Sequence, residues 1–170
     1  MKIRASIILF LLISINSFSQ TTDSQPKFFS ATVGNLQISV PEGFEAIQNQ
    51  QGFVHKGSAS TLLITQMEKV PFTFAEDHFT KQNFEKEGAR IVSTEKIKTT
   101  EGKDAILYTL NLNIATKDGS KTMEYERLIL VTGDANSTIF LVANYPVVVK
   151  KIIEAPIKTS LLSVKLKNKE

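Results

Sequence analysis

The segment from residue 104 to residue 132 constrains the fold more than any other part of the chain. Apolar side chains recur at alternate positions in DAILYTLNLNIA and again in KTMEYERLILVT. A period of two places these side chains on one face of a strand. Asp118-Gly119 lies between the two runs and is a strong signal for a tight hairpin. The sequence therefore predicts a long antiparallel hairpin with one face buried.

Further strands are expected on both sides of this hairpin. GFVHK and TLLITQM indicate a second hairpin, RIVSTEKIK a strand before the long hairpin, and TIFLVANY a strand after it. TIFLVANY follows the turn GDANS and completes a three-stranded meander. Nearer the start, LQISV alternates and ends at Pro41, which has no N–H to donate to a ladder. Gly43 can then adopt the positive φ of a corner, and Phe44 is expected to fold back onto the core.

A helix is predicted in the middle of the chain. Thr73 and Glu76 have capping-box spacing and Gly88 supplies a C-terminal stop, so the expected helix is about fourteen residues long. Its apolar stripe is imperfect, because Phe84 follows Phe79 by five positions and would be turned about 140° away from it. Phe84 is therefore expected either to pack on a second side of the helix or to be exposed.

The C-terminal segment is expected to form an amphipathic helix. Its apolar positions are Val148, Ile152, Ala155 and Leu162, with lysines between them, which is typical of a helix with one buried face. Pro156 is expected to kink or divide it. The predicted fold class is thus α+β, an antiparallel sheet of about six or seven strands flanked by a central helix and a C-terminal helix.

The first nineteen residues have the layout of a secretory signal peptide. Lys2 and Arg4 precede an apolar run from Ile7 to Ile15, and small residues follow at Ser17 and Ser19. As a helix this run spans about 14 Å, less than half of the ~30 Å hydrocarbon core of a bilayer. We expect cleavage after Ser19, with an uncleaved anchor as the alternative. The mature protein is expected to be exported, periplasmic or extracellular, and not membrane-spanning.

The rest of the chain is expected to consist of an arm and one domain. Residues 20–33 are polar and suggest a flexible arm, and residues 34–170 a single domain, because about 150 residues can bury roughly two-thirds of their unfolded surface in one core. Loss of Lys2 and Arg4 reduces the formal charge from +3 to +1, so no basic field favours nucleic acid as a partner. The chain has no cysteine, which excludes disulfides, thiolate catalysis and cysteine-based metal sites.

The sequence contains no catalytic or metal-binding pattern. His55 and His78 are 23 positions apart, without metal-ligand spacing to each other or to paired carboxylates. Ser58 and Ser60 lie in GSAS, which is not the G-x-S-x-G turn of a serine hydrolase. A hydrolase would require one of these serines, or an acid, beside a histidine in a cleft. No catalytic residue, metal ligand or cofactor is therefore predicted.

The candidate interaction residues are Tyr125, Arg127, Phe53 and Phe84. Aromatic side chains and arginine are enriched at binding hot spots, and Tyr125 and Arg127 share one face of a predicted strand. Glu124 and Glu126 lie on the opposite face of that strand and are expected to be solvated charges.

The order of these elements resembles the PsbP-like fold family, which groups the photosystem II protein PsbP, the nuclear import factor Mog and bacterial exported proteins related to DcrB. The resemblance rests on ISVPEGFE, the helix from Phe74 to Glu87, the hairpin around KDGS, and RLILVTGDANSTIFLVANYP with a last helix ending SLLSVKL, and it covers residues 36–166. It implies a six- or seven-stranded antiparallel sheet with helices, usually without catalysis, in proteins that act as partners of larger assemblies.

Together these features predict a non-catalytic exported interaction or adaptor module of the bacterial envelope, with another envelope or secreted protein as its partner. The alternative is a carrier of a small apolar ligand in a cavity between the sheet and the helices. A contiguous exposed apolar patch would favour the adaptor. A closed pocket of at least ~300 Å³ with a few polar groups would favour the carrier.

Overall fold

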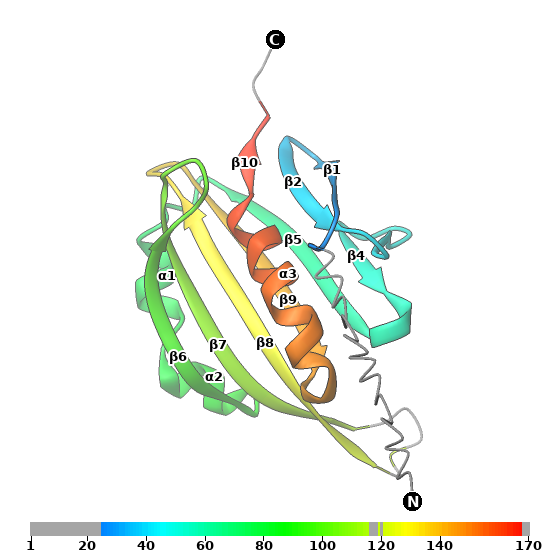
Figure 1. Ribbon diagram of the computed structural model, residues 1–170. Coiled ribbons are helices and arrows are strands. Elements are labelled where there is room, and N and C mark those ends of the chain that lie inside the picture. Colours follow the sequence, from blue (N-terminus) through cyan, green and yellow to red (C-terminus); the bar gives the residue numbers. More distant parts are fainter. Residues whose placement is uncertain (1–24, 116–118, 120, 168–170) are drawn as a thin grey trace, which may run out of the picture.

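A seven-stranded antiparallel sheet forms the centre of the computed structural model, which describes residues 25–115, 119 and 121–167 (Figure 1). Its strands are β3 (Glu45–Ala46), β4 (Gly52–His55), β5 (Ser60–Glu68), β6 (Ala89–Lys98), β7 (Asp104–Ala115), β8 (Thr122–Gly133) and β9 (Ser137–Pro146). Their spatial order is β3-β4-β5-β9-β8-β7-β6. The predicted α+β class and the seven-stranded sheet are confirmed. The signal peptide expected at 1–19 and the turn residue Asp118 lie outside the described residues.

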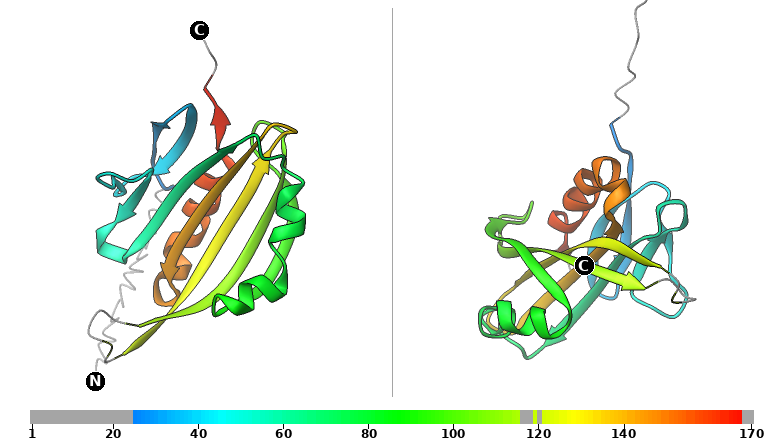
Figure 2. Two further views of the ribbon diagram at one scale, coloured as in Figure 1. Left: turned by 180° about the vertical axis from the view of Figure 1, so that it is seen from behind. Right: turned by 90° about the horizontal axis from the view of Figure 1, so that it is seen from below.

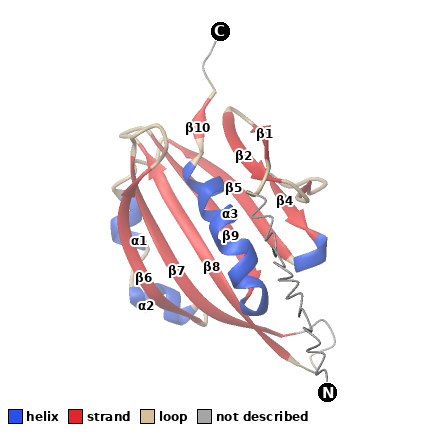
Figure 3. Cartoon of the chain, in the orientation of Figure 1, coloured by secondary structure: helices blue, strands red, loops and turns tan. Residues whose placement is uncertain are grey.

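The remaining elements pack on the two faces of this sheet. A small sheet has the order β1-β2-β10 and is made of β1 (Phe28–Val33), β2 (Leu36–Pro41) and β10 (Lys165–Leu166). The helices are α1 (Phe74–His78), α2 (Lys81–Lys86) and α3 (Lys150–Leu162), with single 3₁₀ turns η1 (Lys56–Ser58) and η2 (Val147–Val149). Helix α3 covers one face of the large sheet, and α1 and α2 cover the other, as the cartoon coloured by secondary structure and the views from behind and below make plain (Figures 2 and 3).

Strands β7 and β8 form the predicted long hairpin. Tyr108 pairs with Ile129 and Leu112 with Tyr125, so the expected apolar residues of the two strands share one face. The opposite face is also apolar in the middle of the strands, because Leu107 is 4% exposed. The hairpin therefore separates two hydrophobic cores.

We call the covered side of the large sheet the α3 face. Its core combines large-sheet residues with residues from α3 and the small sheet. Its members include Leu107, Leu128, Leu130, Leu141 and Tyr145 from the large sheet, Ile153, Ile157 and Leu161 from α3, and Leu36, Ile38 and Val40 from β2. The Ser160 hydroxyl donates to the Ser39 carbonyl at 2.6 Å, and the Ser39 N–H donates to Ser163 Oγ at 2.8 Å. These two bonds fasten α3 to the small sheet.

The opposite side is the groove face, named for the cavity described below. Its core is smaller and consists of the alternate residues of the central strands together with Phe84 of α2. The members are Ile106, Tyr108, Leu110, Ile129, Val131, Phe140, Ala89 and Phe84.

The buried stripe of α3 differs from the predicted one. Val148 and Ile152 are 88% and 78% exposed, whereas Ile153, Ile157 and Leu161 are buried. Both sets of residues have helical spacing, but only the second set continues along the whole helix at intervals of four residues. The helix is also not divided, because Pro156 lies within α3.

The single central helix that was predicted is wrong, because two short helices replace it. Thr80 interrupts the helix and caps α2, accepting a hydrogen bond from the Asn83 N–H at 3.4 Å. The break also answers the question of Phe84. A continuous helix would point Phe79 and Phe84 in different directions, whereas here their ring centroids lie 5.5 Å apart and Phe84 is buried.

The fold begins earlier than the sequence suggested. The segment 28–33, expected to belong to a flexible arm, is strand β1 and pairs with β2 from Phe28–Pro41 to Val33–Leu36. The prediction followed the polar residues that precede this strand. Within the strand, Ala31 and Val33 pack against the core and the Phe29 ring lies 6.3 Å from that of Phe53. At the other end of β2, Gly43 has the expected positive φ of 88°, and Phe44 is buried.

Candidate functional site

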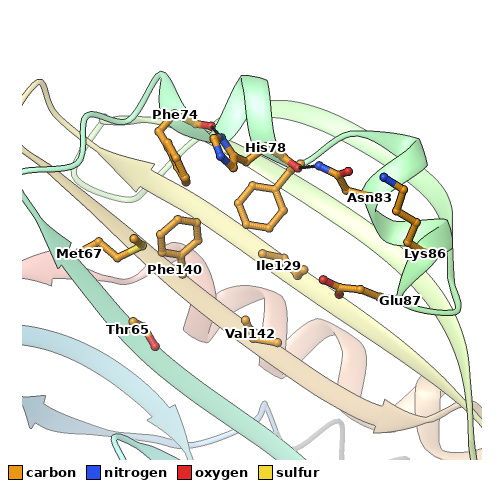
Figure 4. Close-up of a pocket in the computed structure, with 11 residues that line it drawn as sticks. Thr65, Met67, Phe74, His78, Asn83, Lys86, Glu87, Ile129, Phe140 and Val142 are labelled. Carbon is orange, nitrogen blue, oxygen red and sulfur yellow. Dashed lines mark hydrogen bonds between the residues drawn. The ribbon is translucent and has the colours of Figure 1, made fainter.

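An open groove lies between the large sheet and the two short helices, with a volume of about 590 Å³ (Figure 4). Its floor consists of side chains from β5, β8 and β9, and its wall of side chains from α1, α2 and the residues beside them. The floor residues are Thr65, Met67, Ile129, Phe140 and Val142, and the wall residues are Phe74, His78, Phe79, Asn83, Lys86 and Glu87. We call this cavity the apolar groove.

The floor is apolar because alternate residues of neighbouring strands stand in rows. Val142 pairs with Ile129 on one side and Leu63 on the other, and the next row contains Phe140 and Thr65. Side chains of one row share a face, since every second residue points the same way. Thr65 is exposed at the rim. Strand pairing alone therefore builds the floor.

Phe79 supports the wall. Its ring lies 5.5 Å from that of Tyr108 and 5.4 Å from that of Phe140, within the range of favourable aromatic pairs. Because Phe79 precedes the cap residue Thr80, the interruption of the helix is what turns this ring onto the sheet. The same interruption leaves the space that becomes the groove.

The polar wall residues are held by local contacts. The Asn83 amide donates to the carbonyl of His78 at 2.8 Å. The His78 ring stacks on Phe74 with centroids 3.5 Å apart. Among the described wall residues Lys86 and Glu87 form no ion pair, and they lie together at the end of α2.

A polar row crosses the groove face next to the floor. The Arg127 Nε donates to Asn144 Oδ1 at 2.6 Å, and the Asn144 Nδ2 donates to Thr61 Oγ1 at 3.1 Å. Arg127 lies two residues before Ile129 on β8, and Asn144 lies two residues after Val142 on β9. The polar row and the Ile129–Val142 row of the floor are therefore neighbours on one face, about 7 Å apart. Arg127 is half-buried. Arg127 therefore lies one row beyond the apolar floor, just outside the set of side chains that line the cavity.

The structure separates the four predicted interaction residues into two groups. Phe53 and Phe84 are buried, one in each core, and serve packing. Tyr125 and Arg127 are half-buried on the groove face. Arg127 lies one row away from the floor residue Ile129, and Tyr125 lies two rows away from it. The floor residues themselves were missed. TIFLVANY placed Phe140 and Val142 on one face of a strand, but no local pattern indicates that helices leave that face partly uncovered.

The histidine nearest to a serine is His55. The His55 Nδ1 lies 2.7 Å from Ser58 Oγ and accepts from the Ser58 N–H at 3.1 Å. The same ring caps the turn η1 and faces Gly43, whose added Cβ would meet it at 2.9 Å. Neither His55 nor Ser58 lines a described pocket. In the structure the pair caps the turn η1.

Glu126 was expected to be a solvated charge, and this is wrong. Its side chain is 4% exposed and accepts from the Tyr145 hydroxyl and from Lys150 Nζ, the latter at 2.6 Å. Burial, together with the hydrogen bond to Glu126, raises the pKa of Tyr145. The hydrogen bond to Glu126 raises the pKa of Lys150. These three side chains tie the start of α3 to β8 and β9, and we call them the Glu126 lock.

Neither a metal-ligand cluster nor a membrane-spanning helix occurs in the described part of the chain. No group of three or more potential metal-ligating side chains is found within residues 25–115, 119 and 121–167. Over the same residues, every helix is too short or too polar to cross a bilayer.

Comparison with known proteins gives structural neighbours only. No protein-family model and no curated protein matches the chain. A mutant of the protein Mog1 is 11% identical with a TM-score of 0.56, over 84% of this chain and 97% of that chain. LpqN, which is involved in cell envelope biogenesis of Mycobacterium tuberculosis, is 11% identical with a TM-score of 0.56, over 86% of this chain and 94% of that chain.

The cyanobacterial PsbP of Synechocystis sp. PCC 6803 is 12% identical with a TM-score of 0.50, over 89% of this chain and 98% of that chain. These similarities cover nearly the whole of each neighbour. At such identities they concern the fold alone. The chain therefore has the PsbP/Mog1-like fold that its sequence resembled.

Proposed function

We propose that this protein is a non-catalytic, exported binding module whose binding site is the apolar groove. One observation carries the proposal, the open cavity of about 590 Å³ between the sheet and the short helices. Small-molecule sites are typically ~300–1,000 Å³ and are lined mainly by apolar side chains with a few polar ones. The cavity is open, whereas the criterion set for a carrier was a closed pocket. Its volume and its mainly apolar lining nevertheless favour the carrier of a small apolar ligand over the adaptor.

The residues that line the groove suit binding better than catalysis. Their ionisable side chains are His78, Lys86 and Glu87, and covalent catalysis needs a nucleophile held by a base that a third group orients. His78 instead stacks on Phe74, and its Nδ1 lies 3.3 Å from the Phe74 carbonyl. The hydroxyl of the lining belongs to Thr65, on β5 at the opposite side of the cavity (Figure 4).

Filling the groove tests the proposal. We expect the neutral fluorophore N-phenyl-1-naphthylamine to bind the mature protein saturably, and Val142→Trp to weaken its binding at least about tenfold. The chain has no tryptophan, so the new indole also reports on the groove. Val148→Trp on the opposite side, where Val148 is 88% exposed, is the matched control and should bind normally.

Two outcomes of this experiment contradict the proposal. One is a lack of saturable binding by the wild type, and the other is equal binding by Val142→Trp and Val148→Trp. If Val142→Trp does not fold, Thr65→Trp at the exposed rim takes its place, because a substitution at an exposed position usually changes stability by no more than about 0.5 kcal/mol.

A second function, the protein adaptor, is favoured by a different surface. Ile114 and Met123 are 38% and 41% exposed and pair directly on β7 and β8. They extend past the last pairs of β6 and β9, which are Ala89–Leu112 and Tyr125–Pro146. A photo-crosslinking residue at position 123 should capture a specific partner from the envelope fraction, and Ile114→Glu should abolish this capture. Equal capture from position 148 would contradict this function.

A further inference from the structure

We propose that the ligand of the apolar groove is a single-chain amphiphile with an anionic head, and that Arg127 binds this head. The inference deepens the proposed function and depends on it. It assigns the apolar groove to the chain of the ligand and the polar row to its head group.

The position of Arg127 is the first argument. Arg127 lies two residues before Ile129 on β8, in uninterrupted register with β9, so both side chains stand on the groove face. The wall residues Lys86 and Glu87 lie toward the same end as Ile129, away from Met67 and Phe74 (Figure 4). The cavity therefore has an aromatic end and a charged end.

The contacts of Arg127 are the second argument. Its Nε donates to Asn144, which is itself held by Thr61, and this orients the guanidinium. Within the described chain Arg127 forms no ion pair. The two terminal nitrogens of a guanidinium form a fork that matches a carboxylate or a phosphate in bidentate geometry. A half-buried, oriented cation without an anion is a receptor for one.

The charge balance at this end of the cavity supports an anion rather than a cation. Arg127 and Lys86 carry positive charge and Glu87 carries negative charge, so the three side chains sum to +1. The nearby lysine Lys81 is already paired with Glu85 at 3.7 Å. An incoming anionic head would make charge-assisted hydrogen bonds, which are roughly twice as strong as neutral ones.

The size of the cavity limits the apolar part of the ligand. A volume of about 590 Å³ lies in the middle of the range for small-molecule sites. It suits one alkyl chain rather than the two chains of a phospholipid. Phe140, Val142 and Met67 provide an apolar surface along which such a chain would lie, with its head toward Arg127.

The test compares two ligands that share a chain and differ in the head. Dissociation constants of laurate and 1-dodecanol are measured on the mature protein by displacement of N-phenyl-1-naphthylamine. We expect laurate to bind at least about tenfold tighter than 1-dodecanol, because a hydrogen bond to a charged group contributes roughly that factor to affinity. Arg127→Gln should abolish this preference without changing the affinity for 1-dodecanol, and Arg127→Lys should keep part of it.

Arg90→Gln is the matched control, because Arg90 is an exposed arginine on edge strand β6. It should leave both affinities unchanged. Glu87→Gln should tighten laurate binding a few-fold, because it removes the negative charge at the head-group end. Glu87 is exposed, so Glu87→Gln can replace Arg127→Gln as the test of an anionic head group if Arg127→Gln does not fold. Unchanged laurate binding by Glu87→Gln would then overturn the inference.

The remaining outcomes separate the inference from the proposed function. Equal binding of laurate and 1-dodecanol, or a preference that survives Arg127→Gln, overturns the anionic head but leaves the groove as an apolar site. Binding of neither ligand, nor of the fluorophore, overturns both. Tight binding of an acidic amphipathic peptide without binding of laurate overturns the amphiphile and assigns the groove to a protein segment.

Discussion

The two faces of the large sheet are built from the same strands and are covered very differently. On the α3 face a thirteen-residue helix and a second sheet close over the core. On the groove face two helices of five and six residues cover part of the sheet and leave a cavity. The α3 face therefore has the larger and more completely covered core, whereas the groove face leaves part of its apolar surface open.

The faces also differ in the partners of their half-buried cations. On the α3 face Lys150 contacts Glu126 at 2.6 Å and Glu154 at 3.9 Å. On the groove face Arg127 has an amide oxygen of Asn144 as its partner and, among the described carboxylates, none in an ion pair. Lys150 is thus neutralised within the fold, whereas Arg127 has no carboxylate partner among the described residues.

The largest effect is expected from adjacent residues of β9 that point to opposite faces. Leu141 is fully buried on the α3 face, and Val142 is half-buried in the groove. Leu141→Ala should lower the free energy of unfolding by about 2–5 kcal/mol. Val142→Ala should lower it by less than about 1 kcal/mol, because the groove already exposes this side chain to water. Urea denaturation measures both, and equal losses would erase the distinction between the faces.

A second comparison concerns lysines of α3. Lys150→Met leaves the carboxylate of Glu126 without its cation, and we expect a loss of about 2–3 kcal/mol, less than for a fully buried pair because Lys150 is partly exposed. Lys158 pairs at 2.9 Å with Glu154 on the surface, so Lys158→Met should cost at most about 1 kcal/mol. Chemical denaturation at low salt provides the values. A similar cost for both variants would show that the Glu126 lock contributes no more than a surface pair.

The smallest effect depends on pH. Tyr145→Phe removes one hydrogen bond to Glu126, with an expected loss of about 1–2 kcal/mol near neutral pH. Because the pKa of Tyr145 is raised in the native state, the unfolded chain releases this proton first, and wild-type stability should fall as pH rises above about 10. The raised pKa of Lys150 acts in the same direction.

The measurement for Tyr145→Phe is urea denaturation at several values between about pH 8 and about pH 11, on either side of the ordinary tyrosine pKa. The variant should lose stability more gradually than the wild type in the upper part of this range, because one of the two shifted groups is gone. Parallel curves would show that Tyr145 does not contribute to the alkaline loss. Binding of a neutral groove ligand should be unaffected in the range where both proteins remain folded, since the Glu126 lock lies on the other face.

The strands could be predicted from the sequence and the coverage of the sheet could not. Alternation predicted that Tyr108 and Ile129 each lie on the apolar face of their strands, and the two residues pair in the long hairpin. The sequence predicted one continuous central helix because only Thr73 was considered as an N-terminal cap. Thr80, which caps α2, was not considered. Arg127 was selected as an exposed contact residue and lies half-buried on the groove face. Phe53 and Phe84 were selected for their aromatic character, which serves packing as often as binding.

The sequence by itself determined which residues alternate, where turns occur and which neighbouring strands form hairpins, because these depend on contacts between near neighbours in the chain. Only the tertiary structure decided which stripe of α3 is buried, that Glu126 is enclosed with Lys150 and Tyr145, and that α1 and α2 leave Phe140 and Val142 at the floor of a groove. These features depend on contacts between segments that are far apart in sequence. Periodicity assigns a residue to a face, but only packing determines whether that face is covered.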